Sequence, residues 1–122
     1  MLFRSGARLI GSNSDNSYPT RDGVLPGGGA VLAAIAAASG REPVVTGKPH
    51  RPMADLVLSR CPGVDPRSML MVGDKVSTDG LFAGTLGCPF ALVMTGVTPS
   101  GSAPDGVHVF DDLASVVAEV LG

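Results

Sequence analysis

The sequence has no tryptophan and one tyrosine, and aromatic residues make up only 4% of its 122 residues. Proteins that bind single-stranded nucleic acid stack the bases on aromatic side chains, so a surface of this kind is not expected. Lysine and arginine together number 9 against 11 acidic residues, which gives a formal net charge of -2. The chain therefore lacks the basic field that attracts a phosphate backbone, and we expect no nucleic-acid partner.

Cysteine is scarce, and long apolar runs are missing. Cys61 and Cys88 are too far apart in sequence for a redox pair or a metal knuckle, and the first five residues contain no apolar signal segment. Two such thiols fit a reducing compartment. The longest apolar stretch, residues 30–38, is too short to span a bilayer. We therefore expect a cytoplasmic protein without a membrane partner.

Charged residues are also few, at 16%, whereas hydrophobic residues make up 44% of the chain. This balance favours a folded chain with a buried core over a disordered one. With so few aromatic residues, the core should consist mainly of alanine, valine and leucine. The length suits one domain of ordinary size.

Short apolar runs alternate with segments of helical character along the chain. The first residues, from residue 2, are expected to end a helix and lead into a strand at 7–10, which a polar loop over 11–29 follows. The alanine-rich residues 30–38 predict a helix that Gly40 ends. Further on we predict strands at 43–46, 69–73, 90–95 and 107–110, and helices at 51–60, 78–87 and 111–121. Strands that alternate with helices indicate a parallel sheet with right-handed crossovers.

Two carboxylates follow the apolar run of residues 69–73. Asp74 stands at the end of the expected strand, and Asp79 stands five residues later, where a helix should begin. Open α/β sheets place ligand sites at the carboxyl ends of their strands, and paired carboxylates suit a hard cation such as Mg²⁺. The alternative interpretation is turn and cap chemistry, with Thr78 or Ser77 capping the helix.

Lys48 occupies a similar place, just after the β-branched run of residues 44–46 and just before a predicted helix. A cation beside a helix amino terminus attracts phosphate, and the compact ammonium group of lysine can neutralise a phosphoryl group. Pro49 stands where a P-loop requires serine or threonine, so this segment is not a P-loop. An exposed loop lysine is the alternative.

These segments, together with three others in the same order, resemble the haloacid dehalogenase (HAD) superfamily phosphatases of the NagD-type, or p-nitrophenyl phosphatase, branch. The resemblance is carried by residues 12–15 (Ser-Asn-Ser-Asp), 22–27 (Asp-Gly-Val-Leu-Pro-Gly), 47–49 (Gly-Lys-Pro), 73–79 (Gly-Asp-Lys-Val-Ser-Thr-Asp) and 93–98 (Val-Met-Thr-Gly-Val-Thr). It implies an α/β fold in two parts. Residues 1–42 would be the carboxy-terminal part of an α/β cap domain. Residues 43–122 would be the carboxy-terminal half of a Rossmann-like HAD core, a parallel sheet with flanking helices.

The resemblance also implies an activity, the Mg²⁺-dependent hydrolysis of a phosphorylated small molecule through an aspartyl-phosphate. By this resemblance Asp74 is a direct Mg²⁺ ligand. Lys48 and Asp79 are catalytic, with Asp79 ordering the waters of the metal and holding Lys48, and Lys48 also contacts the substrate.

Three residues of the 12–18 segment are substrate-binding candidates by the same resemblance, since this loop folds from the cap over the active site. They are Asn13, Asp15 and Tyr18. Asparagine and aspartate also favour turns, so a purely structural role for Asn13 and Asp15 is equally open. Tyr18 offers a ring that can stack and a hydroxyl that can bond.

The sequence lacks the Asp-x-Asp nucleophile motif of this family. Covalent catalysis needs that nucleophile, so we expect the chain to be inactive by itself. It is then a fragment of a longer phosphatase, one chain of a split phosphatase that a complementary amino-terminal half completes, or a non-catalytic truncated relative that acts as a binding or assembly module. We also expect the chain to form a homo-oligomer or to require a complementary partner, because the strand edge that should pair with the nucleophile strand is left open. The identity of the substrate does not follow from the family.

Overall fold

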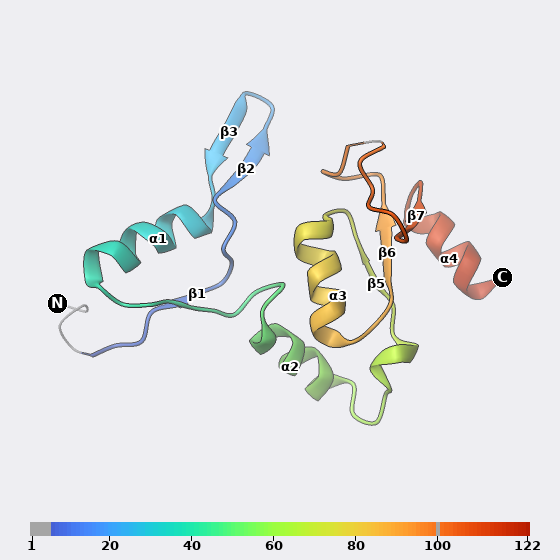
Figure 1. Cartoon of the computed structure of the whole chain (residues 1–122), viewed down its shortest axis with the longest axis horizontal. Helices are drawn as coiled ribbons and strands as arrows, with labels where there is room; N and C mark the ends of the chain where they lie inside the picture. Colours follow the sequence, from blue (N-terminus) through green and yellow to red (C-terminus); the bar gives the residue numbers. More distant parts are fainter. Residues whose placement is uncertain (1–5, 100) are drawn as a thin grey trace.

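The computed structural model describes residues 6–99 and 101–122, which form an amino-terminal and a carboxy-terminal part joined through helix α2 (Figure 1). The strands are β1 (Ile10–Gly11), β2 (Ser17–Thr20), β3 (Gly23–Pro26), β4 (Val44–Val45), β5 (Met71–Gly73), β6 (Phe90–Val93) and β7 (His108–Phe110). The helices are α1 (Gly28–Ser39), α2 (Arg51–Arg60), α3 (Leu81–Leu86) and α4 (Leu113–Leu121), with a 3₁₀ turn η2 (Pro66–Ser68) and a π-helical turn η3 (Val76–Gly80).

The carboxy-terminal part is a parallel sheet with the strand order β5-β6-β7. On one face, Met71 joins a cluster formed by Ala54 of α2 with Phe82 and Leu86 of α3. On the other face, residues of β6 pack against Val116 of α4. The two clusters lie on opposite faces because neighbouring strand residues point to opposite sides of a sheet, and α3 and α4 accordingly flank the sheet in Figure 1.

Leu92 of β6 is fully buried in this sheet, at 0% exposure. Replacing it by alanine should lower the free energy of unfolding by about 2–5 kcal/mol, because the lost contacts leave a cavity. Urea denaturation followed by circular dichroism measures this change. The matched control is Leu121→Ala at the exposed end of α4, which should stay within about 0.5 kcal/mol. Equal effects of the two substitutions would contradict the position of Leu92 at the centre of the sheet.

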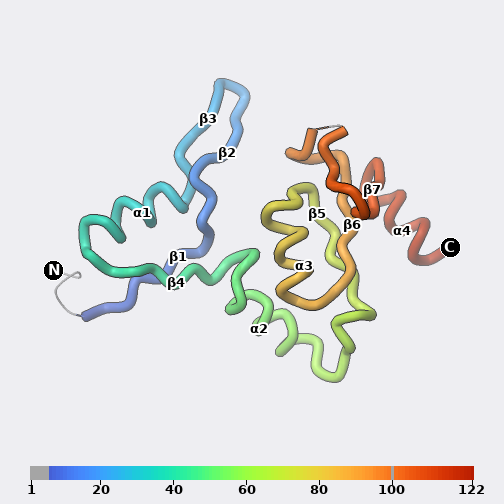
Figure 2. Tube along the Cα trace, in the orientation of Figure 1, coloured from blue at the N-terminus to red at the C-terminus, as the bar shows by residue number. Residues whose placement is uncertain are grey.

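The amino-terminal part contains a parallel pair of short strands, β1 and β4, in which Ile10 faces Val44. Helix α1 packs on this pair through Leu32, and a Cβ atom on Gly11 would collide with that leucine. The Cα trace shows β1 and β4 side by side, after which the chain passes once into α2 and the carboxy-terminal part (Figure 2). The strands β1 and β4 and helix α1 are therefore packed together.

The expected loop over residues 11–29 is wrong in its centre, where β2 and β3 form an antiparallel hairpin around Arg21 and Asp22. All residues of both strands are exposed, so the sequence shows no alternation of buried and exposed positions. Pro19 and Pro26 lie within these strands. They are tolerated because each strand of an isolated hairpin is an edge strand.

Most other predicted elements are present. Helix α2 has the predicted bounds, and Gly40 ends α1 in a left-handed conformation with φ 62°. The predicted helix 78–87 begins earlier, as the π-helical turn η3, and β4 pairs with β1 and has no partner in the three-stranded sheet of the described residues. Asp112 caps α4 by accepting hydrogen bonds from the Ser115 N–H and hydroxyl groups, which lowers the pKa of this carboxyl group.

The helix end expected from residue 2 falls largely outside the described residues, and the strand expected at 7–10 is β1, shifted to Ile10–Gly11. None of the helices in the described ranges has the length and hydropathy needed to cross a bilayer.

Candidate active site

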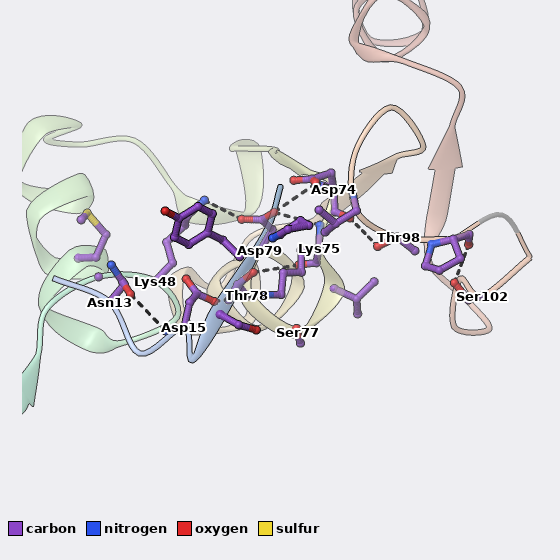
Figure 3. A pocket seen from close by; sticks show the side chains of 18 of the residues that line it. Asn13, Asp15, Lys48, Asp74, Lys75, Ser77, Thr78, Asp79, Thr98 and Ser102 are labelled. Atoms are coloured by element: carbon purple, nitrogen blue, oxygen red, sulfur yellow. Dashed lines mark hydrogen bonds and ion pairs between the residues drawn. The ribbon is translucent and has the colours of Figure 1, made fainter. Parts of the chain in front are cut away.

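A cleft of about 950 Å³ brings together four segments that are distant in sequence. Its lining comes from residues within 12–19, 47–53, 74–79, 97–99 and 102–104 (Figure 3). All six residues singled out in the sequence line this one cleft: Asn13, Asp15, Tyr18, Lys48, Asp74 and Asp79. Lys48 follows β4 and Asp74 follows β5, and the ion pair between Lys48 and Asp79 joins these two segments.

Asp79 is the buried centre of the site, with 4% exposure. Its Oδ1 atom is 2.6 Å from Lys48 Nζ, and its Oδ2 atom accepts the N–H groups of Asp74 and Lys75, each at 3.2 Å. The π-helical turn η3 places Asp79 there, and a Cβ atom on Gly73 would overlap its side chain. The carboxylate thus ties together the lysine segment and the turn that follows β5.

Asp74 points into the cleft from the end of β5. Its Oδ2 atom accepts the Val97 N–H group at 2.8 Å, and its carbonyl oxygen accepts a short hydrogen bond from the Thr98 hydroxyl group. Gly96 permits this approach, since a Cβ atom there would collide with the Asp74 carboxylate. The loop after β6 therefore fixes the Asp74 side chain through one oxygen.

Lys48 lies beside Asp79 with 46% of its side chain exposed. The preceding residue, Gly47, is buried where a Cβ atom would collide with the Ser12 carbonyl oxygen. Helix α2 starts at Arg51, close behind the lysine. An ammonium group in this position is anchored on one side and open to the cleft on the other.

The three candidates of the 12–18 segment line the same cleft. Asn13 Oδ1 accepts the Asp15 N–H group at 3.2 Å, which is the turn geometry considered for these two residues. Asp15 Oδ1 forms an ion pair with Lys75 Nζ at 3.0 Å. Tyr18, on β2, is 51% exposed. A turn role for Asn13 and a place in the cleft lining are thus compatible.

Lys75 is a member of the site that sequence reasoning missed. It lies within the Gly73–Asp79 motif, but its partner Asp15 is 60 residues away, so no local pattern marked it. The chain contains two lysines, Lys48 and Lys75, and both line the cleft. None of the arginines in the described ranges does. The sequence did contain one signal, the scarcity of lysine: it has two lysines, and Lys75 directly follows the candidate metal ligand Asp74.

Comparison with known proteins identifies the class. The sequence profile of the HAD-hydrolase-like family matches residues 45–116, which is more than half of the chain. The chain therefore belongs to the HAD-like hydrolase family. Its α/β fold, with a parallel sheet between helices, is that of HAD phosphatases of the NagD and p-nitrophenyl phosphatase type.

The relatives of the chain include proteins named phosphatases and one named a nucleotidase. The chain is 38% identical over 108 residues to the D-glycerol 3-phosphate phosphatase of Mycobacterium tuberculosis, which covers 88% of the chain and 29% of that protein. It is 35% identical over 117 residues to the 5'-nucleotidase YutF of Bacillus subtilis, covering 93% and 45% of the two chains. The chain thus spans less than half the length of either relative.

Solved structures of phosphatases also match the chain over less than half of their length. The p-nitrophenyl phosphatase from Archaeoglobus fulgidus matches with a TM-score of 0.80 and 34% identity, over 93% of this chain and 47% of the other. The 4-nitrophenylphosphatase from Thermotoga maritima matches with a TM-score of 0.80 and 32% identity, over 96% and 46%. The described fold is therefore close to half of a phosphatase of this type.

Proposed function

We propose that this chain forms part of the active site of a phosphate monoester phosphatase. The observation that carries the proposal is the 2.6 Å ion pair between Lys48 and the buried Asp79, next to Asp74 in one cleft. An anchored cation beside carboxylates at strand ends is an arrangement that binds and polarises a phosphoryl group. The names of the relatives, which are phosphatases of small molecules, support this reaction class.

Lys48 supplies the positive charge for the phosphoryl oxygens. A lysine ammonium group has three N–H donors, and one of them is directed to Asp79. The remaining donors serve the phosphoryl group as its negative charge is redistributed in the transition state. Asp79 keeps the ammonium group in place, and its own charge is satisfied by three donors.

Asp74 is the proposed Mg²⁺ ligand. Its Oδ2 atom is occupied by the Val97 N–H group, which leaves Oδ1 for a cation. No group of three or more histidine, cysteine, aspartate or glutamate residues converges on a metal position within residues 6–99 and 101–122. This fits Mg²⁺, which is usually bound through one or two carboxylates, waters and substrate phosphate. When bound, the ion would neutralise phosphoryl charge.

The attacking carboxylate must come from a further segment, because the sequence has no Asp-x-Asp motif. In the reaction that the family resemblance implies, an aspartate oxygen bonds to phosphorus while the bond to the ester oxygen breaks. The leaving oxygen takes up a proton, and water then hydrolyses the aspartyl-phosphate. We infer that a polypeptide carrying this motif completes the cleft.

A complementation assay tests the proposal. The purified chain alone should show negligible hydrolysis of p-nitrophenyl phosphate with Mg²⁺. Mixing it with the amino-terminal half of a relative, which carries Asp-x-Asp, should give turnover that depends on both polypeptides and on Mg²⁺. Binding of the two polypeptides is measured separately by analytical ultracentrifugation.

Two outcomes would contradict the proposal. Steady turnover by the chain alone, removed by Asp74→Asn, would show that the chain contains its own nucleophile. A stable complex that contains every part and hydrolyses no phosphate monoester would instead favour the second candidate function, a non-catalytic binding module. The absence of the nucleophile motif supports that second candidate, and calorimetric binding of inorganic phosphate without turnover would be its signature.

A further inference from the structure

Lys75 contacts both sides of the cleft. Its backbone N–H group donates to Asp79 Oδ2 at 3.2 Å, and its ammonium group pairs with Asp15 Oδ1 at 3.0 Å (Figure 3). Two ion pairs among residues 6–99 and 101–122 connect the amino-terminal part to the carboxy-terminal part. They are Lys75–Asp15 and Lys48–Asp79, and the other two are local. One residue thus links the buried carboxylate of the site to the loop before the hairpin.

The loop that carries Asp15 is hydrogen-bonded to the start of α1. The Asp15 carbonyl oxygen accepts the Gly29 N–H group at 2.8 Å, and the Gly27 N–H group donates to the Asn16 carbonyl oxygen at 2.8 Å. A Cβ atom on either glycine would collide with the loop backbone. Asp15 therefore lies at the base of the hairpin, three residues before Tyr18 on β2.

The Lys75–Asp15 pair is too exposed to be a major source of stability. The side chains are 41% and 44% exposed, and ion pairs of this kind contribute little to folding. The ammonium group of Lys75 is engaged on the hairpin side of the cleft, whereas Lys48 lies beside Asp79. The pair is suited to orienting the loop that carries Asp15 relative to the segment that follows β5.

We propose that Lys75 is a positioning residue that acts through Asp15. By holding Asp15 it keeps Asn13 and Tyr18 at a set place over the cleft, opposite Asp74 and Asp79, where the leaving group of a bound phosphate ester would lie. Its effect on substrate rests on the proposed phosphatase function. Its effect on the loop does not, and it can be measured without any activity.

The test of the loop uses Tyr18. This is the single tyrosine of a chain without tryptophan, so tyrosine fluorescence reports on the hairpin alone. Lys75→Met and Asp15→Asn should each raise acrylamide quenching of Tyr18 and lower its anisotropy, because each removes the ion pair that joins the loop to the segment after β5. Lys75→Arg should keep the wild-type values. Arg51→Met is the matched control, since it also removes an exposed ion pair, with Asp55, outside the cleft lining.

The second readout is kinetic, in the complemented enzyme. Lys75→Met should raise KM for p-nitrophenyl phosphate about two- to fivefold, which corresponds to the contribution of one exposed ion pair. The value of kcat should change little, because the contact serves ground state and transition state equally. Lys75→Arg should restore KM.

The outcomes separate the two proposals. Unchanged Tyr18 quenching in folded Lys75→Met and Asp15→Asn would overturn the positioning role. So would a raised KM with unchanged quenching, since Lys75 would then contact the substrate itself. If the complemented enzyme proves inactive, the proposed function fails, and the Tyr18 measurement still decides whether Lys75 holds the loop. Circular dichroism spectra identical to wild type establish that each variant is folded.

Discussion

Asp74→Asn in the complemented enzyme should reduce Mg²⁺-dependent turnover by more than about 100-fold. That is the upper end of the loss seen when a residue that contacts a metal ligand, and not the metal itself, is substituted. Asparagine keeps an oxygen that can accept the Val97 N–H group at the present position of Oδ2. The substitution therefore removes the negative charge and leaves the loop contact in place. A neutral amide is a poor ligand for Mg²⁺. The measurement is kcat/KM over a titration of Mg²⁺.

Asp111→Asn is the matched control. Asp111 also follows a strand of the same sheet, β7, but it is exposed and does not line the cleft. It should leave the Mg²⁺ dependence unchanged. Equal effects of the two substitutions would show that Asp74 has no special place in metal binding.

A substitution at Gly96 tests the position of the same Asp74 carboxylate. A Cβ atom at this position would collide with the Asp74 carboxylate, so Gly96→Ala must displace the side chain while the charge remains. We expect turnover to fall and to recover in part at high Mg²⁺ concentration. Recovery of this kind distinguishes a misplaced ligand from a lost one, and Asp74→Asn should not show it.

The half of the site that lies at strand ends was predictable from the sequence. Lys48 and Asp74 each follow a short apolar run, and the carboxyl ends of strands are where open α/β sheets place ligand sites. The two strands, β4 and β5, belong to different sheets, so that rule marked each residue as a candidate and did not place the two together. Asp79 was predictable because it stands one turn further on, where its carboxylate can reach back to the N–H groups after β5. The contacts of Asp79 with the Asp74 and Lys75 N–H groups are local, whereas its ion pair with Lys48 joins residues 31 apart.

The parts that sequence reasoning missed depend on contacts between distant residues. The hairpin β2–β3 has no buried face to impose a period of two on its sequence, and its prolines suggested a loop. The Lys75 ammonium group finds its partner, Asp15, on the other part of the molecule. The pairing of β4 with β1 likewise joins residues 34 apart, as Ile10 faces Val44, and two strands of this length carry little pattern of their own.

Lys48→Met should lower kcat of the complemented enzyme by about 10²- to 10³-fold, the range seen when one preorganised donor to a developing negative charge is removed. Methionine has a similar length, so the cleft keeps its shape and loses the ammonium group. The Mg²⁺ dependence should stay the same, because Lys48 contacts Asp79 and not Asp74. This combination would separate the phosphate-facing charge from the metal-facing carboxylate.

The same substitution also leaves Asp79 as a buried carboxylate without its cation, which lowers the stability of the chain. The double variant Lys48→Met with Asp79→Asn removes that unpaired charge, so its unfolding midpoint should rise above that of Lys48→Met. Its activity should remain low. A recovery of stability without a recovery of activity would show that partial unfolding is not the cause of the low activity.

Lys48→Arg and Arg51→Met complete this experiment. Arginine keeps the charge but spreads it over a planar fork, so Lys48→Arg should retain part of the activity. Arg51→Met removes a cation three residues further on, outside the cleft lining, and should behave like the wild type. If Lys48→Met were as active as Arg51→Met, the ion pair with Asp79 would be a structural contact only. The phosphate would then have to be bound by Lys75 or by the added polypeptide.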